Sequence, residues 1–172
     1  DPARVAHWRA RLGDAARPRI GLVWSGSPTH ANDRRRSLAF RTLIDGLPVG
    51  PLYVSLQREV RAGDAEALRE RPAVLHLGDE LRDFDDTAAL CTLLDAVVSV
   101  DTSVAHLAGA LGKRVWILLP WLPDWRWLLE REDSPWYRSA TLFRQKRRGD
   151  WECALDKLGR DMAILARDSQ SR

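Results

Sequence analysis

The sequence predicts an α/β protein built on a doubly wound parallel sheet of about six strands. Short apolar runs alternate along the chain with stretches of helical periodicity. Such alternation implies parallel strands joined by right-handed crossovers. The clearest unit is the segment 96–119, AVVSVDTSVAHLAGALGKRVWILL, whose two apolar runs flank a helix of small residues. We interpret this segment as strand, helix and strand.

Boundary residues and periodicity define the elements of the first half. Gly13 ends a short lead-in helix, and Pro18 precedes the first strand. In chain order we expect a helix over Val5–Leu12, a strand over Arg19–Trp24, a helix over Leu38–Leu47, a strand over Leu52–Leu56, a helix over Asp64–Glu70 and a strand over Val74–Leu77.

The second half continues the alternation. Gly112 is a natural stop for the helix of the central unit, and the last helix carries its apolar residues on one face. We expect a helix over Asp86–Leu94 with Asp85 as its cap, a strand over Val97–Val100, a helix from Thr102 or Ser103 to Leu111, strands over Arg114–Leu119 and Ala140–Arg144, and a helix over Trp151–Arg167.

Length and composition limit the domain organisation and the partners. The 172 residues suffice for one domain over 19–168, with a lead-in helix and linker over 1–18 and a tail over 169–172. The net charge of +3 is mild, and no RNA-binding or helix-turn-helix pattern supports nucleic acid as a partner. We expect no membrane span and no signal peptide. Cys91 and Cys153 lack metal-ligand spacing, so we interpret them as reduced thiols of a cytoplasmic protein.

The strongest candidate site lies where the strand 97–100 ends. Asp101 follows that strand, and Thr102 and Ser103 are good N-cap residues for the next helix. Free N–H groups and the positive end of the helix dipole would point outward there, which suits a phosphate. The carboxylate beside them suggests that the ligand also carries hydroxyl groups. Open α/β sheets bind ligands at this edge.

A long polar loop follows the first strand at the same sheet edge. The expected glycine-rich GxGxxG pattern is absent, so NAD and FAD are not expected as cofactors. The loop Ser25–Ser37 instead carries Arg34, Arg35 and Arg36, which could clamp a diphosphate bidentately. The alternative is a solvated loop in which Asp33 pairs with an arginine.

Other polar residues near this edge have both a binding and a structural interpretation. His106 lies one turn into the helix after Asp101 and could face a phosphate or that carboxylate. Gln57 and Glu59 follow the second strand, where a ribose or base would lie. Asp85 and Asp86 are more simply helix-capping residues. Of the tryptophans at 121, 125, 127 and 136, some belong to the core, and one could stack on a base or sugar.

Four motifs together resemble a known family. The segment Asp101–Gly112, DTSVAHLAGALG, is similar to the signature D-[ST]-G-x-x-H-L-A-A-A-L-G of the heptosyltransferase-like glycosyltransferases of family 9. The likeness is closest to the versions at the C-terminal end of bacterial tetratricopeptide-repeat proteins. Those proteins share three further segments, which appear here as Gly21–Ser37, Asp83–Leu90 and Pro123–Tyr137. The resemblance covers Arg19 to Leu158.

The resemblance implies one half of a GT-B glycosyltransferase, namely the Rossmann-like C-terminal half that binds the nucleotide-sugar donor. The acceptor and the catalytic base would belong to the missing N-terminal domain, so no catalytic residue is expected in this chain. Arg36 corresponds to the residue that contacts the donor phosphate, and Asp101 to a residue near the transferred sugar. Ser103 stands where the heptosyltransferases have Gly.

These positions yield a defined set of expectations. The binding residues are Ser25, Arg36, Gln57, Asp101, Thr102, Ser103 and His106, and the donor is an ADP- or UDP-linked sugar held without a metal and without a further cofactor. The companion domain and tetratricopeptide repeats of the same chain would be the partners. The alternative is a non-catalytic nucleotide-binding or protein-interaction module derived from a glycosyltransferase.

Overall fold

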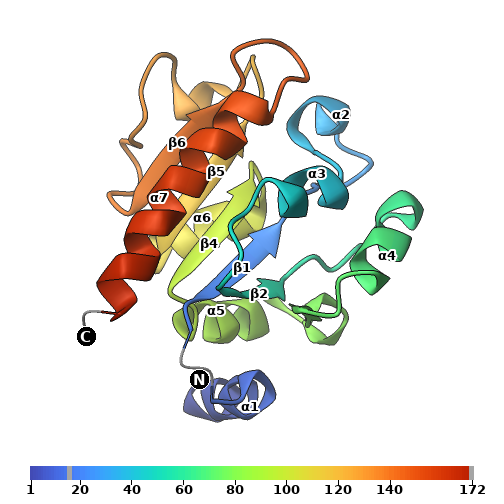
Figure 1. Ribbon diagram of the computed structural model, residues 1–172, viewed down its shortest axis with the longest axis vertical. Coiled ribbons are helices and arrows are strands. Elements are labelled where there is room, and N and C mark those ends of the chain that lie inside the picture. The colour runs from blue at the N-terminus through green and yellow to red at the C-terminus, as the bar shows by residue number, and fades with distance from the viewer. Residues whose placement is uncertain (15–16, 171–172) are drawn as a thin grey trace.

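Six parallel strands form a single sheet in the computed structural model, which describes residues 1–14 and 17–170 (Figure 1). The strands are β1 (Arg19–Val23), β2 (Leu52–Ser55), β3 (Val74–His76), β4 (Ala96–Val100), β5 (Arg114–Leu119) and β6 (Ala140–Arg144). Their order across the sheet is β3-β2-β1-β4-β5-β6, so the chain winds outward in both directions from the β1–β4 pair. This arrangement confirms the predicted doubly wound parallel sheet.

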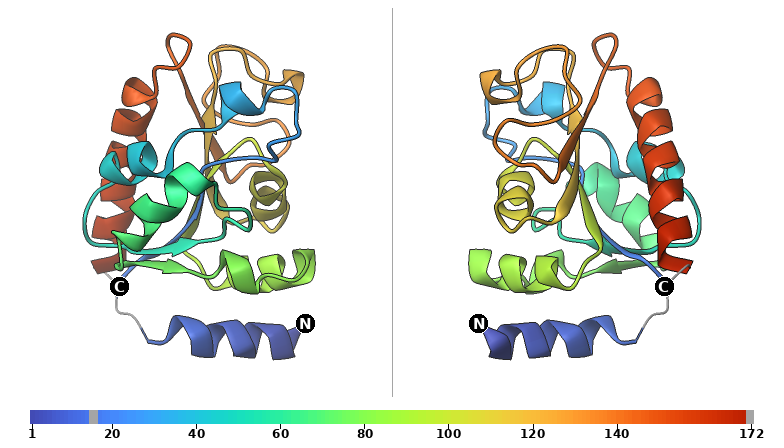
Figure 2. Two further views of the ribbon diagram at one scale, coloured as in Figure 1. Left: turned by 90° about the vertical axis from the view of Figure 1, so that its right-hand side faces the viewer. Right: turned by 90° about the vertical axis from the view of Figure 1, so that its left-hand side faces the viewer.

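Helices cover both faces of the sheet, as parallel strands require. The helices are α1 (Pro2–Leu12), α2 (Asp33–Arg36), α3 (Phe40–Asp45), α4 (Ala62–Arg69), α5 (Phe84–Thr92), α6 (Ser103–Ala110) and α7 (Glu152–Gln170), with 3₁₀ turns at Gly78–Glu80 and Trp125–Trp127. Figure 2 shows α5 and α6 on one side of the sheet and α7 on the other.

Two hydrophobic clusters result, one on each face. Alternate residues of the strands point into opposite clusters: Val97 packs toward α5 and α6, whereas Val98 packs toward α3 and α7. All five residues of β4 are buried. The sequence of this central strand is therefore apolar apart from Ser99 and does not alternate between apolar and polar residues.

The N-terminal helix α1 packs outside α5 and is one layer further from the sheet (Figure 2). Trp8 of α1 is only 1% exposed. Arg4 binds Asp83 and Asp86 near the start of α5, and Arg11 binds Glu80. The predicted lead-in helix thus exists, but it begins three residues earlier than expected because Asp1 caps it by accepting from Ala3 N.

Several predicted boundaries are wrong by a few residues. The cap of α5 is Asp83 rather than Asp85, since the Asp83 side chain accepts from Asp86 N. The helix expected over 38–47 is shortened to α3, and the loop 25–37 contains the short helix α2. The helix α4 begins at Ala62, and α7 extends to Gln170, past the expected start of the tail. Residues 171–172 of that tail lie outside the described residues.

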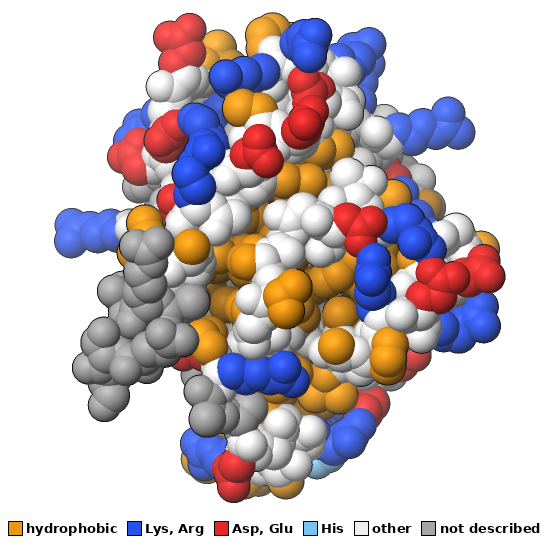
Figure 3. Space-filling view, viewed as in Figure 1, with side chains coloured by type: hydrophobic (Ala, Val, Ile, Leu, Met, Phe, Trp, Pro, Cys, Tyr) orange, Lys and Arg blue, Asp and Glu red, His pale blue; other side chains and the backbone are white. Residues whose placement is uncertain are grey.

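One face of the molecule mixes apolar and charged side chains. Figure 3 shows hydrophobic side chains over the middle of the face that bears α3, α4 and α7, with basic and acidic side chains interspersed around them. Within the described ranges, no helix combines the length and the apolar character needed to cross a bilayer.

Candidate functional site at the start of α6

The carboxyl ends of β1 and β4 form the point where the chain reverses its winding direction. β1 and β4 are adjacent, and their successors β2 and β5 lie on opposite sides of them. The crossovers therefore leave in opposite directions and open a crevice above the two strand ends. Ligands of open α/β sheets bind in such crevices. Thr102, at the N-cap position of α6, lies at this point.

The start of α6 presents unpaired backbone donors. Thr102 has extended backbone angles, but its side chain makes no capping hydrogen bond. Its hydroxyl instead lies 3.0 Å from Ser99 Oγ. Within the described chain, the N–H groups of Ser103 and Val104 donate to no other group. These free donors and the helix dipole make the start of α6 suitable for an anion.

Two cavities meet at this helix end. The first, which we call the Gln57 cavity, has a volume of about 470 Å³ and is lined by residues of the β1, β2 and α5 segments, including Ser25, Gln57 and Phe84. The second, the Asp101 cavity, has a volume of about 280 Å³. Thr102 and Ser103 line both cavities, so the start of α6 is their common wall.

Ser25 carries an unused polar group in the wall of the Gln57 cavity. The residue is 2% exposed, and its hydroxyl has no hydrogen-bond partner. A buried polar group without a partner costs free energy, and a hydrogen bond to this hydroxyl would recover part of that cost. This observation is independent of the α6 start and places a second unpaired polar group in the same crevice.

The side chain of Gln57, which was expected to bind a ligand, makes hydrogen bonds to the protein backbone. Its side-chain oxygen accepts from Trp24 N and Ser25 N at 3.1 Å each, and its amide donates to Ser25 O at 3.0 Å. A further bond reaches Glu59 O at 3.2 Å. Because the backbone uses both ends of this amide, Gln57 fixes the chain after β1 while its side chain also lines the cavity.

Arg36 connects the polar loop to the end of β4. Its Nη1 donates to the backbone oxygen of Asp101 at 2.6 Å, and its Nε is buried without a partner. Gly26 makes this position possible, since a Cβ atom there would lie 2.4 Å from Arg36 Nη2. Arg36 also lines the Asp101 cavity. The guanidinium therefore lies at the predicted site and holds the strand end in place.

The Asp101 carboxylate is kept charged by its surroundings. Burial raises the pKa of Asp101, but the neighbouring side chains of His106 and Trp127, together with the positive charge of Arg36, outweigh burial, and the pKa lies below its usual value. His106 Nε2 is 3.7 Å from Asp101 Oδ1. A charged carboxylate in the cavity wall can accept hydrogen bonds from ligand hydroxyl groups.

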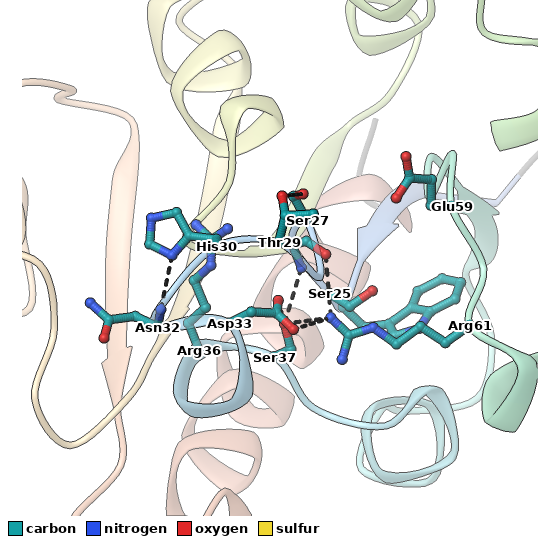
Figure 4. Close-up of polar contacts among 12 residues, drawn as sticks. Ser25, Ser27, Thr29, His30, Asn32, Asp33, Arg36, Ser37, Glu59 and Arg61 are labelled. Atoms are coloured by element: carbon teal, nitrogen blue, oxygen red, sulfur yellow. Dashed lines mark hydrogen bonds and ion pairs between the residues drawn. The ribbon is translucent and has the colours of Figure 1, made fainter.

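A second arginine secures the loop between β1 and α3. Figure 4 shows Arg61, at the cap of α4, reaching across to Asp33 and Ser37. The Arg61–Asp33 ion pair measures 2.5 Å, and Ser37 Oγ donates to Asp33 at 2.7 Å. The pairing of Asp33 with an arginine, which was the alternative interpretation of this loop, is thus present. The partner, however, is Arg61 from outside the loop, and Arg36 remains at the cavity.

The tryptophan-rich segment divides between core and surface. Trp127 is fully buried, whereas Trp121, Trp125 and Trp136 are each more than half exposed. The guanidinium of Arg126 lies over the Trp125 ring. The structure thereby identifies Trp127 as the core member of the four.

All seven predicted binding residues lie in the walls of the two cavities. The Gln57 cavity is lined by Ser25, Gln57, Thr102 and Ser103. The Asp101 cavity is lined by Arg36, Asp101, His106 and again by Thr102 and Ser103. Their binding roles remain predictions. Sequence reasoning missed Tyr137 and Arg61, which come from distant segments. Tyr137 ends the motif 123–137, but no local pattern connected it to His106.

These features define the class of the fold as a doubly wound parallel α/β domain with a crevice at the point where its winding direction reverses. The chain is similar over 99% of its length to "E. coli ADP-heptose lps heptosyltransferase II", with a TM-score of 0.59 and 17% identity, and it covers 53% of that chain. It is also similar to a family 9 glycosyl transferase from Veillonella parvula, with a TM-score of 0.53 and 12% identity, and covers 50% of that chain. At these identities the likeness shows the fold.

Among curated proteins, the chain is similar to Protein FlbA of Caulobacter vibrioides. The two are 32% identical in an alignment of 168 residues, and the match covers 92% of this chain and 27% of FlbA. The chain therefore spans about a quarter of that relative and about half of the two solved structures. No family model matches the chain.

Proposed function

We propose that this chain binds the nucleotide-diphosphate sugar that serves as donor in a metal-independent glycosyl transfer. The single observation that carries the proposal is the meeting of the two cavities at the start of α6, beside the unpaired hydroxyl of Ser25. A ligand with three parts fits this arrangement. The nucleoside would occupy the Gln57 cavity, the diphosphate would lie at α6, and the sugar would reach Asp101.

The charges of the described residues suit a donor of this kind. Ser103 and Val104 would donate backbone hydrogen bonds to the diphosphate, and Arg36 would neutralise part of its charge. Asp101 would accept hydrogen bonds from the sugar. Among the described residues, no three His, Cys, Asp or Glu side chains are grouped so as to hold a metal ion. The proposal assigns the stabilisation of the leaving diphosphate to Arg36 and the backbone donors of Ser103 and Val104.

The whole protein is proposed to be larger than this domain. The similar solved structures contain a second half, and we propose that a companion domain, together with tetratricopeptide repeats, completes the enzyme in the cytoplasm. The companion would supply the acceptor site and the catalytic base. This chain alone should then bind the donor without transferring its sugar.

The test is ligand-dependent thermal stability. A nucleoside diphosphate present at a hundred times its dissociation constant stabilises the folded state by about 2.7 kcal/mol. For a domain of this size that corresponds to an increase in Tm of about 5 to 10 °C. ADP, UDP and GDP are compared, with the matching nucleosides as controls that lack the phosphates. If none of the diphosphates raises the Tm, the proposed donor site is wrong.

Arg36→Ala should weaken the binding of the preferred diphosphate by about tenfold or more, because one charge-assisted hydrogen bond is worth about 1.5–3 kcal/mol. The Tm of the unliganded protein should also fall, since the Asp101 backbone oxygen loses its donor. The matched control is Arg34→Ala, which removes an exposed neighbour that lines neither cavity. Calorimetry measures both affinities. Equal losses in the two variants would mean that Arg36 acts only through net charge.

A further inference from the structure

The imidazole ring of His106 is held by three side chains. Its Nδ1 lies 3.0 Å from the hydroxyl oxygen of Tyr137, and its Nε2 lies 3.7 Å from Asp101 Oδ1. The ring also stacks on Trp127, with 5.1 Å between the ring centroids and an angle of 20° between the planes. One ring nitrogen therefore faces Tyr137, and the other faces the carboxylate in the wall of the Asp101 cavity.

Tyr137 reaches His106 because α6 leaves room for its ring. The helix carries Gly109 three residues after His106, on the same face. A Cβ atom at Gly109 would lie 2.5 Å from Tyr137 Cγ and 2.8 Å from both neighbouring ring carbons. Only glycine permits this approach. The segment before β6 and the helix α6 are thus fitted to each other around the Tyr137–His106 contact.

The surroundings of His106 favour one of its two neutral tautomers. If Nδ1 carried the hydrogen, the Nε2 lone pair would face the charged carboxylate of Asp101, which is unfavourable. If Tyr137 donates to Nδ1, the hydrogen lies on Nε2 and points toward Asp101 and the cavity. The 3.7 Å separation is too long for a direct hydrogen bond, so the Nε2–H group is free to bind a ligand oxygen.

We propose that Tyr137 is a positioning residue that fixes His106 as a donor through Nε2–H to a phosphate or sugar oxygen of the ligand in the Asp101 cavity. Tyr137 itself does not line either cavity. Its effect on binding is transmitted through the imidazole, whose tautomer and orientation it sets. The ligand part of this inference rests on the proposed function, whereas the tautomer of His106 does not.

The first measurement is independent of any ligand. Nitrogen-15 NMR of the side-chain imidazoles distinguishes a protonated from an unprotonated ring nitrogen, and a series of spectra at increasing pH identifies the neutral form. We expect Nε2 of His106 to be protonated and Nδ1 to show the shift of a hydrogen-bond acceptor. In Tyr137→Phe, the Nδ1 resonance should move to that of an acceptor without a partner. Tyr53→Phe is the matched control, because the Tyr53 hydroxyl donates to Pro48 O, away from the site.

The second measurement is the affinity for ADP, UDP and their glucose conjugates by calorimetry. Tyr137→Phe should weaken binding of the best of these probes by about fivefold, the effect of one hydrogen bond, while Tyr53→Phe leaves it unchanged. His106→Gln supplies an amide donor near the position of Nε2 without needing Tyr137. Adding Tyr137→Phe to His106→Gln should then cause no further loss of affinity. A double-mutant cycle detects this non-additivity as coupling between the two residues.

The outcomes separate the two hypotheses. If no probe binds the parent protein, the proposed function fails, and the inference about Tyr137 is decided by the NMR result alone. If the Nδ1 resonance is the same in the parent and in Tyr137→Phe, the inference about Tyr137 is overturned. Equal affinity of the parent and Tyr137→Phe, or additive losses in the cycle, also overturn it. If Tyr137→Phe does not fold, the inference is tested by the tautomer of His106 in the parent protein. A hydrogen on Nδ1 of His106 would overturn the inference.

Discussion

Ser103→Glu is expected to abolish nucleoside-diphosphate binding while leaving the fold at least as stable. Ser103 is exposed at the first position of α6, so a glutamate there is accommodated without repacking. The proposed ligand places its phosphates beside this residue, and the repulsion is judged for like charges about 4 Å apart. At an effective dielectric constant of about 20, each such repulsion costs about 4 kcal/mol. We therefore expect the affinity to fall by at least about a hundredfold.

The stability of the same variant should change in the opposite direction. A negative charge in the first turn of a helix interacts favourably with the helix dipole, by about 0.3–1 kcal/mol. Thermal unfolding measures this effect, and calorimetry measures the binding loss. Ser103→Gln is the control, because it has the same size without the charge. Retained ADP or UDP binding by Ser103→Glu would show that the diphosphate does not lie at α6.

Asp64→Ala is expected to destabilise the fold strongly. Asp64 is 6% exposed and accepts hydrogen bonds from Trp24 Nε1 and from Phe40 N, each at 2.9 Å. Alanine would leave both donors buried and unpaired. At about 1–3 kcal/mol for each donor, the free energy of unfolding should fall by about 4 kcal/mol.

This loss should reach the binding site, because Trp24 immediately precedes Ser25 and Phe40 begins α3. Chemical denaturation measures the free energy, and the Tm should fall by about 10 °C. Asp64→Asn keeps one acceptor oxygen and should lose about half as much. Asp79→Ala removes an exposed carboxylate and serves as the control. A loss in Asp64→Ala no greater than in Asp79→Ala would contradict the assigned role.

The position of the site at a sheet edge depends on rules that hold for any doubly wound sheet. Asp101 follows a buried strand directly, and Thr102 and Ser103 begin a helix. The carboxyl ends of parallel strands lie on one edge, so the loop after β1 had to lie near them. The structure agrees, and the hydrogen bond from Arg36 to Asp101 O joins the two segments.

The chemistry within the site depends on contacts that no local pattern encodes. The sequence shows a glutamine after β2. The fold shows that its side-chain amide is hydrogen-bonded to the backbone of Trp24 and Ser25. Likewise, Asp33 pairs with Arg61 rather than with a loop arginine. Such partners are 28 to 33 residues apart, and which of many arginines or amides fills a position is decided by packing.

The α/β class, the six strands and the gathering of seven polar residues around one helix end could be predicted from the sequence. Periodicity and capping are local properties of the sequence. Because the strands are parallel, the residues that follow them are brought to one edge of the sheet. The three-dimensional structure was needed to show that Trp127 is in the core, that Tyr137 contacts His106 and that Gly109 makes room for the Tyr137 ring. Those contacts join segments about 30 residues apart in sequence, and their selection depends on side-chain volume and shape in three dimensions.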